Sequence, residues 1–362
     1  MANNVEFWRH ILGKHPRDVA AEAEEIEAEG WHGGILVDSH CLVPEVWSTL
    51  TLCATKTKTL MLTTGATNPI TRHPSVTAAN AATLQLISNG RAALGIARGD
   101  SALANLGAAP VKIGKFEHYL TIIQSYLRGE SIPLATVAEL IVDAAHDFDK
   151  VAIGTGPVGS QLGWLKQFDL PKVPLEVIAT GPKAIEAGAR TAEWVILAVG
   201  ADPSRLKWGM EIANAAAKAA GREIKIGAFL AVVPHPEPAA ARRLAVPLAA
   251  TAGRFSVMNK KVVGPATPRQ REMLEKLAAS YDMNSHGKIG AHSSVVDEEF
   301  IDQFAVVGPP SHCIDRMQEL MSLGLSRFNI LNGSNGSFMP NDEDTLLSKK
   351  LLSSTVLPAL QG

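Results

Sequence analysis

Polar and glycine-rich residues directly follow four consecutive apolar runs in this 362-residue chain. They are Asp38-Ser39-His40, Gly65-Ala66-Thr67-Asn68-Pro69, Gly99-Asp100-Ser101 and Thr180-Gly181-Pro182-Lys183. The last stretch leads into a helical pattern, and the exposed N–H groups at a helix start bind phosphate, with Lys183 adding positive charge. The residue types therefore indicate an anion site and, at Asp38, His40 and Asp100, side chains able to exchange a proton.

Each stretch also has an ordinary structural interpretation, which the sequence leaves open. Asp38, Ser39 or Asp100 can cap the helix that follows, and His40 can be a loop histidine with no catalytic task. Asn68-Pro69 favours a turn in any protein. Residues 180–183 match neither a Walker A loop nor a GxGxxG fingerprint, so the phosphate signal is weak by itself.

The elements that must position these residues form a regular alternation. Eight short apolar runs predict buried parallel strands. They span residues 5–8, 34–37, 60–64, 92–97, 175–179, 194–199, 224–233 and 327–331. Helical patterns fall between them, and repeated strand–helix units favour a (β/α)₈ barrel, whose active site lies at the carboxyl ends of the strands. A doubly wound sheet is the competing α/β arrangement.

Local signals predict individual helices and two insertions. Residues 16–29 form an amphipathic helix, Asp202 before Pro203 starts another, and Ser311 is predicted to cap a third. Residues 130–172 and 253–300 do not fit the alternation, and we expect both insertions at the mouth of the barrel, where they would select the substrate. Trp164, His286 and His292 are candidate contacts there.

Composition excludes several classes of protein. The length suggests two domains, but a barrel of this type often forms one, so we expect a single domain over residues 1–362. Hydrophobic residues make up 46%, which supports a large core, and the net charge of −2 gives no general attraction for nucleic acid. The three cysteines have no ligand or disulfide spacing, and no apolar run is long enough to span a membrane. We expect a cytoplasmic protein without a metal site.

The motifs resemble the bacterial luciferase-like superfamily. The likeness rests on the stretch from Gly65 to Ala79, on Asn89-Gly90-Arg91 with the run that follows, and on the stretches at Asp38, Gly99 and Gly181. It is similar above all to the coenzyme F420-dependent branch that includes methylenetetrahydromethanopterin reductase. The likeness covers most of the chain in order, is dense over residues 30–107 and is weakest over the two insertions.

The resemblance implies a (β/α)₈ barrel that binds a deazaflavin or flavin at its mouth, often as a homodimer. In the F420 branch a bulge after the third strand holds a non-prolyl cis peptide beneath the ring, which by motif position is Gly65–Ala66 here. The cofactor phosphate would lie at Gly181. The cofactor-binding residues implied in this way are Asp38, Thr64, Gly65, Ala66, Thr67, Asn68, Gly99, Thr180, Gly181, Pro182 and Lys183.

The resemblance also implies the catalytic candidates Asp38, His40 and Asp100. Asp100 falls where F420-dependent sugar-phosphate dehydrogenases carry an acidic residue near the substrate, and a buried carboxyl there would exchange a proton as hydride moves. Those relatives place a histidine directly after the aspartate of the second strand, whereas this chain has Ser39 there and His40 one place later. Oxidation of a sugar phosphate is therefore in doubt.

Three functions remain distinguishable. The first is an F420-dependent oxidoreductase that transfers hydride between the deazaflavin C5 and a small organic substrate. The second is an FMN-dependent monooxygenase that uses reduced flavin and O₂. The third is a cofactor-free relative that acts as a binding or structural partner. An acidic F420 tail could be met by basic residues of the second insertion, namely Arg254, Lys260, Lys261, Arg269 and Arg271.

Overall fold

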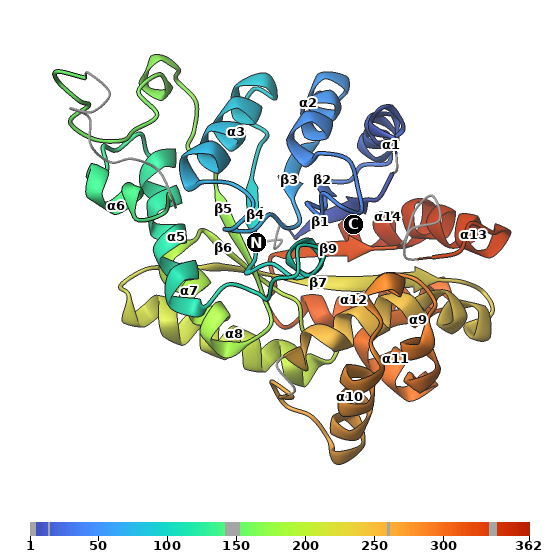
Figure 1. Cartoon of the computed structure of the whole chain (residues 1–362). Helices are drawn as coiled ribbons and strands as arrows, with labels where there is room; N and C mark the ends of the chain where they lie inside the picture. Colours follow the sequence, from blue (N-terminus) through green and yellow to red (C-terminus); the bar gives the residue numbers. More distant parts are fainter. Residues whose placement is uncertain (1–4, 14, 142–152, 259–260, 333–338) are drawn as a thin grey trace.

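The computed structural model describes residues 5–13, 15–141, 153–258, 261–332 and 339–362. Its strands are all parallel and form a nearly closed barrel, around which the helices form a ring (Figure 1). The strands are β1 (Glu6–Ile11), β2 (Gly33–Leu36), β3 (Met61–Thr64), β4 (Leu94–Ile96), β5 (Leu175–Ala179), β6 (Trp194–Leu197), β7 (Lys225–Pro234), β8 (Ala305–Gly308) and β9 (Arg327–Leu331).

The order of the strands is β3-β2-β1-β9-β7-β6-β5-β4, and two isolated bridges, Leu62 to Ala92 and Thr67 to Ile96, join β3 to β4. The eight predicted strands correspond to β1–β7 and β9, so the predicted (β/α)₈ barrel is confirmed. Strand β8 was not predicted. It pairs with the last four residues of β7, and it begins at Ala305 directly after α11 ends at Phe304, so no turn signal separates its apolar run from the helix.

The helices follow the strands as the alternation predicts. They are α1 (Pro16–Ala28), α2 (Val46–Lys56), α3 (Pro74–Ile87), α4 (Ser101–Ala104), α5 (Ile113–Leu127), α6 (Leu134–Ala138), α7 (Pro182–Thr191), α8 (Pro203–Ala219), α9 (Pro238–Phe255), α10 (Pro268–Ser280), α11 (Glu298–Phe304), α12 (Pro310–Met321), α13 (Glu343–Leu351) and α14 (Leu357–Gln361). Short 3-10 turns lie at Leu165–Gln167, Met283–Ser285 and Ala291–Val295, and a π-helical turn spans Leu352–Val356. None of the described helices is both long and apolar enough to cross a membrane.

Two predicted helix starts had different outcomes. The Asp202 carboxylate accepts a hydrogen bond from the Ser204 N–H at 2.8 Å, and Pro203 begins α8 as predicted. The prediction that Ser311 caps a helix was wrong. Helix α12 begins at Pro310, and its first turn has no side-chain cap, so Ser311 lies inside the helix.

The amino-terminal half of the barrel interior holds the buried guanidinium of Arg327, which is in contact with two carboxylates and two tryptophan rings. Arg327 pairs with Glu176 and, at 2.7 Å, with Glu6. Its guanidinium lies 4.0 Å from the ring centre of Trp8 and 3.8 Å from that of Trp194. Ion pairing and stacking together compensate the arginine for the water it loses on burial.

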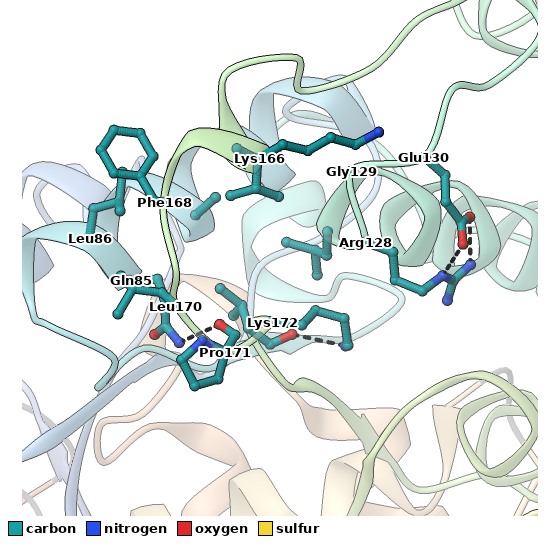
Figure 2. Close-up of a pocket in the computed structure, with 14 residues that line it drawn as sticks. Gln85, Leu86, Arg128, Gly129, Glu130, Lys166, Phe168, Leu170, Pro171 and Lys172 are labelled. Atoms are coloured by element: carbon teal, nitrogen blue, oxygen red, sulfur yellow. Dashed lines mark hydrogen bonds and ion pairs between the residues drawn. The ribbon is translucent and has the colours of Figure 1, made fainter.

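The two insertions occupy different places. The described residues of the first insertion help to line a cavity of about 520 Å³, together with the carboxyl-terminal ends of α3 and α5. Gln85, Arg128 and Lys172 are among the residues of its lining (Figure 2). None of them lines the cavity at the carboxyl ends of the strands, contrary to our expectation. The difference has a physical cause: in a βα unit the helix runs back along its strand, so its carboxyl end lies at the opposite end of the barrel. The second insertion does reach the mouth.

Candidate active site at the mouth of the barrel

A cavity of about 420 Å³ lies at the carboxyl ends of the strands. Its lining includes ten residues predicted for the site: Asp38, Gly65, Ala66, Asn68, Gly99, Asp100, Thr180, Gly181, Pro182 and Lys183. These residues come from the ends of β2, β3, β4 and β5, which are brought together because parallel strands in a barrel all end at the same face. The second insertion and α9 contribute Phe255, Met258, Val263 and His286.

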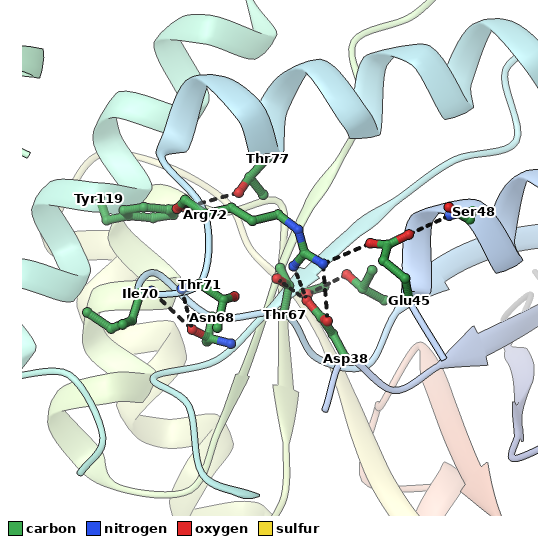
Figure 3. Close-up of polar contacts among 12 residues, drawn as sticks. Asp38, Glu45, Ser48, Thr67, Asn68, Ile70, Thr71, Arg72, Thr77 and Tyr119 are labelled. Atoms are coloured by element: carbon green, nitrogen blue, oxygen red, sulfur yellow. Dashed lines mark hydrogen bonds and ion pairs between the residues drawn. The ribbon is translucent and has the colours of Figure 1, made fainter. Parts of the chain in front are cut away.

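Asp38 is buried at the end of β2 and is held by two partners from the β3–α3 connection (Figure 3). Its Oδ2 accepts hydrogen bonds from the Thr67 hydroxyl at 2.7 Å and from Arg72 at 2.5 Å. Arg72 also pairs with Glu45 at 2.8 Å, and its hydrogen bond to Asp38 raises the pKa of the guanidinium against the opposing effect of burial. These two contacts tie Asp38 to Thr67 and Arg72, so its carboxylate fixes the neighbouring loop.

The peptide bond between Gly65 and Ala66 is cis, as the resemblance implied. A Cβ on Gly65 would lie 2.2 Å from the Ile35 Cγ2 and 3.2 Å from the His10 ring, so only glycine fits against the barrel interior. Asn68 turns the chain after this bond, because its Oδ1 accepts hydrogen bonds from the Ile70 and Thr71 N–H groups. Its buried Nδ2 has no partner among the described residues and lies in the wall of the cavity.

Asp100 directly precedes α4, in the N-cap position, but its side chain makes no cap hydrogen bond. Its carboxylate pairs instead with Arg254 of α9, and both side chains are mostly buried. The Arg254 guanidinium lies 4.8 Å from the ring centre of Tyr281, which ties the start of the second insertion to the end of β4.

Tyr281 joins two histidines of the second insertion to this ion pair. Its hydroxyl is 2.8 Å from the Nδ1 of His286, and its ring stacks on His292 with centres 4.4 Å apart. Burial lowers the pKa of His286 and raises that of Tyr281. His286 lines the cavity, whereas the buried His292 supports Tyr281 from behind.

The start of α7 forms the wall of the cavity at β5. Gly181 precedes the helix and faces open space, since no atom lies within 4 Å of its missing side chain. The Thr180 hydroxyl donates to the Ala198 carbonyl at 3.0 Å, so its proton is engaged within the protein. Lys183 is exposed in the first turn of this ten-residue helix. The arrangement suits an anion.

The floor of the cavity contains polar residues that the sequence analysis missed. His10 of β1 and Asn329 of β9 are buried, and the His10 Nδ1 and Asn329 Oδ1 have no hydrogen-bond partner among the described residues. Phe229 of β7 contacts the His10 ring edge-on at 5.1 Å. Alternate side chains along β1, β7 and β9 face the barrel interior, but the sequence does not show which alternate set does so until the strand register is known.

Other predicted residues lie elsewhere. His40 is exposed and is not part of the cavity lining, and neither are the buried Thr64 and Thr67 or the more distant Trp164. Of the basic residues expected to meet an acidic tail, Arg254 is paired with Asp100, and Arg269 is paired with Asp297 and Glu299. Lys261 and Arg271 are exposed, and Lys260 lies outside the described residues. No cluster of three or more potential metal ligands is found in the described ranges.

Comparisons with known proteins agree with this architecture. The chain is 26% identical over 347 residues to the 5,10-methylenetetrahydromethanopterin reductase of Methanolobus tindarius, which covers 92% of this chain and 95% of the relative. It is 26% identical over 289 residues to the enzyme of the same name from Methanopyrus kandleri, covering 77% of this chain and 78% of the relative.

Among solved structures, the coenzyme F420-dependent tetrahydromethanopterin reductase from Methanopyrus kandleri superposes with a TM-score of 0.70 at 22% identity, covering 99% of both chains. An F420-dependent secondary alcohol dehydrogenase in complex with an F420–acetone adduct gives a TM-score of 0.67 at 16% identity, again covering 99% of both chains. The family model for luciferase-like monooxygenase matches residues 5–327. The chain belongs to the luciferase-like monooxygenase family.

Proposed function

We propose that this protein, an oxidoreductase of the luciferase-like family, uses coenzyme F420 to transfer hydride to or from a small organic substrate. The observation that carries the proposal is the mouth cavity itself. It brings the cis Gly65–Ala66 bond, an unpartnered amide at Asn68 and the start of α7 to one space of about 420 Å³. The named F420-dependent relatives support the choice of cofactor.

The residues present fit a flat, hydrogen-bonding ring with an anionic extension. A buried amide without a partner costs about 1–3 kcal/mol, and a bound ring edge would satisfy the Asn68 Nδ2. Gly65 and Ala66 would support the ring face, while the start of α7 at Gly181 and the Lys183 ammonium would hold the phosphate. When bound, F420 supplies a hydride-accepting carbon.

The chain's own groups then position the reactants and manage the proton. Asp38 holds Thr67 and Arg72 and so fixes the loop beneath the ring. We propose Asp100 as the group that exchanges a proton with the substrate. Asp100 lines the mouth cavity, so a substrate bound there would lie beside its carboxylate, which would take up the proton that the substrate releases as hydride leaves. His40, exposed and away from the lining, remains a prediction that the geometry does not favour.

An FMN-dependent monooxygenase is the second candidate. A 3,6-diketocamphane monooxygenase solved in complex with FMN superposes with a TM-score of 0.63 at 16% identity. The two cofactors share a tricyclic ring and a phosphate, so the same walls would accept either. The prediction of a homodimer belongs to this proposal and is checked by the mass of the protein in solution.

Titration of the purified protein with F420 and with FMN, followed by absorbance and fluorescence, tests the proposal. We expect F420 to bind with a Kd in the micromolar range or below and FMN to bind at least tenfold more weakly. Saturable FMN binding without measurable F420 binding would favour the monooxygenase. Binding of neither cofactor would favour the cofactor-free relative.

A further inference from the structure

The lining of the mouth cavity divides into a charged side and an uncharged side. The charged residues Asp38, Arg98, Asp100 and Lys183 follow strands β2, β4 and β5. The lining residues within β1, β7 and β9 are His10, Phe229, Asn329 and Leu331, none of which is a carboxylate, lysine or arginine.

His10, Phe229 and Asn329 are adjacent because the three strands are paired. Phe229 lies opposite Asn329 across β7 and β9, and Trp8, two residues before His10, lies opposite Asn329 across β1 and β9. Side chains two residues apart point to the same face of a strand, so all three face the barrel interior. His10 also lies beside Gly65, so this group borders the cis peptide bond.

Two of the three side chains carry buried polar atoms without a partner. His10 is 6% exposed and Asn329 is 3% exposed, and neither the His10 Nδ1 nor the Asn329 Oδ1 has a hydrogen-bond partner among the described residues. Buried polar groups in native proteins are nearly always paired, so each exception requires an explanation. Here both groups line a cavity large enough for a ligand.

Resting on the F420-dependent function above, we infer that His10 and Asn329 form the subsite for the reacting part of the substrate. The geometry points to an uncharged planar group that presents a hydrogen-bond donor to the Asn329 oxygen and a complementary atom to the His10 ring, with its face against Phe229. Amides, lactams and the edges of neutral nitrogen heterocycles have this chemistry. Burial lowers the pKa of His10 to about 3, so its ring is neutral near pH 7 and offers no charge to a carboxylate or phosphate.

The stability of the ligand-free protein provides the first test. If the two polar atoms serve a ligand, the apolar variants Asn329→Leu and His10→Leu lose no internal hydrogen bond at those atoms. We expect each to keep or raise the melting temperature, by about 1–3 °C. The matched control is Gln85→Leu, a buried amide that donates to the Pro171 carbonyl and accepts from the Ala92 N–H. It should lower the melting temperature by several degrees, and an equal loss in Asn329→Leu would overturn the inference.

Binding of nicotinamide and nicotinate, which share one shape and differ in charge, provides the second test. Titration by calorimetry at pH 7.5, with and without F420, should give a Kd for nicotinate at least tenfold above that for nicotinamide. Asn329→Leu and His10→Leu should each weaken nicotinamide at least fivefold. Equal affinity for both compounds, no binding of nicotinamide, or an unchanged Kd in both variants would contradict the subsite.

The experiments distinguish failure of the proposed F420-dependent function from failure of the proposed subsite. If the wild-type protein binds no F420, the proposed function fails, while the melting temperatures and the probe titrations still decide the subsite. If F420 binds but nicotinate and nicotinamide bind alike, the subsite fails and the cofactor assignment stands.

Discussion

The two halves of the barrel interior both bury polar side chains, but they treat them differently. In the amino-terminal half, Arg327 pairs with Glu6 and Glu176 and is stacked between two tryptophans. In the carboxyl-terminal half, His10 and Asn329 leave polar atoms without partners. Fully paired polar groups hold the fold together, whereas unpaired ones at a cavity are available to a ligand.

Two ion pairs in the carboxyl-terminal half show that not every polar side chain there is left without a partner. Asp38 and Asp100 lie at the cavity yet are both engaged, by Arg72 and Arg254. These two carboxylates therefore each have a partner within the protein, whereas the neutral His10 and Asn329 keep polar atoms without one among the described residues. Four predictions test this division, from the largest expected effect to the smallest.

Removal of Arg327 should have the largest effect on stability. Arg327→Met leaves Glu176 buried without its partner, and such losses cost about 3–5 kcal/mol. Urea unfolding should show this decrease in the free energy of unfolding. The control is Arg190→Met, which breaks a partly exposed pair with Glu117 and should cost about 1 kcal/mol or less. Similar losses in both variants would show that the buried ion pairs of the amino-terminal half contribute no more to the free energy of unfolding than a partly exposed pair does.

Asp38→Asn should weaken both stability and cofactor binding. Its side chain is 1% exposed, so breaking the pair with Arg72 should cost roughly 2–3 kcal/mol, and loosening of the Thr67 loop should raise the Kd for F420 at least tenfold. The control is Glu45→Gln, the other partner of Arg72, whose side chain is 47% exposed. Thermal unfolding and fluorescence titration measure the two effects. Equal losses of stability and of F420 affinity in the two variants would show that the burial of Asp38 does not make its ion pair more important than that of Glu45.

The free energy of unfolding should decrease as the pH is lowered below 6.5, because of His10. Its pKa is about 3 in the folded protein and near 6.5 in the unfolded chain, so below pH 6.5 the unfolded state binds a proton that the native state does not. The free energy of unfolding should then drop by up to about 1.4 kcal/mol per pH unit between pH 6 and 4. His10→Leu should flatten this slope, and the exposed His40→Leu should not. A slope unchanged in His10→Leu would mean that His10 is protonated when folded.

Lys183→Met should have the smallest effect. An exposed lysine at the start of α7 adds modest attraction for an anion, so the Kd for F420 should rise about two- to fivefold, and the difference should shrink at high salt. The control is Lys218→Met, in the last turn of the neighbouring helix α8, which should leave the Kd unchanged. Titration at two ionic strengths checks this, and a change that persists at high salt would point to a direct structural role instead.

Much of the fold was predictable because buried parallel strands read as apolar runs. All eight barrel strands were placed, with ends differing by at most a few residues, and the cis Gly65–Ala66 bond followed from the resemblance. Strand β8 was missed because it follows α11 with no intervening residue, so the sequence has no turn signal between them. The predicted place of the first insertion was wrong because the sequence analysis did not identify α5, and a segment that follows a helix emerges at the amino-terminal end of the barrel.

The sequence by itself determined which residue types follow each strand, and parallel strands guarantee that such residues meet at one face. It could not determine which of them are already paired. Arg72 and Arg254 are far from Asp38 and Asp100 in the chain, and only the packing of α3 and α9 against the barrel brings each pair together. The same holds for His10 and Asn329, which are 319 positions apart and become neighbours only through the closure of the sheet. Tertiary structure alone decided which groups of the cavity are left for a ligand.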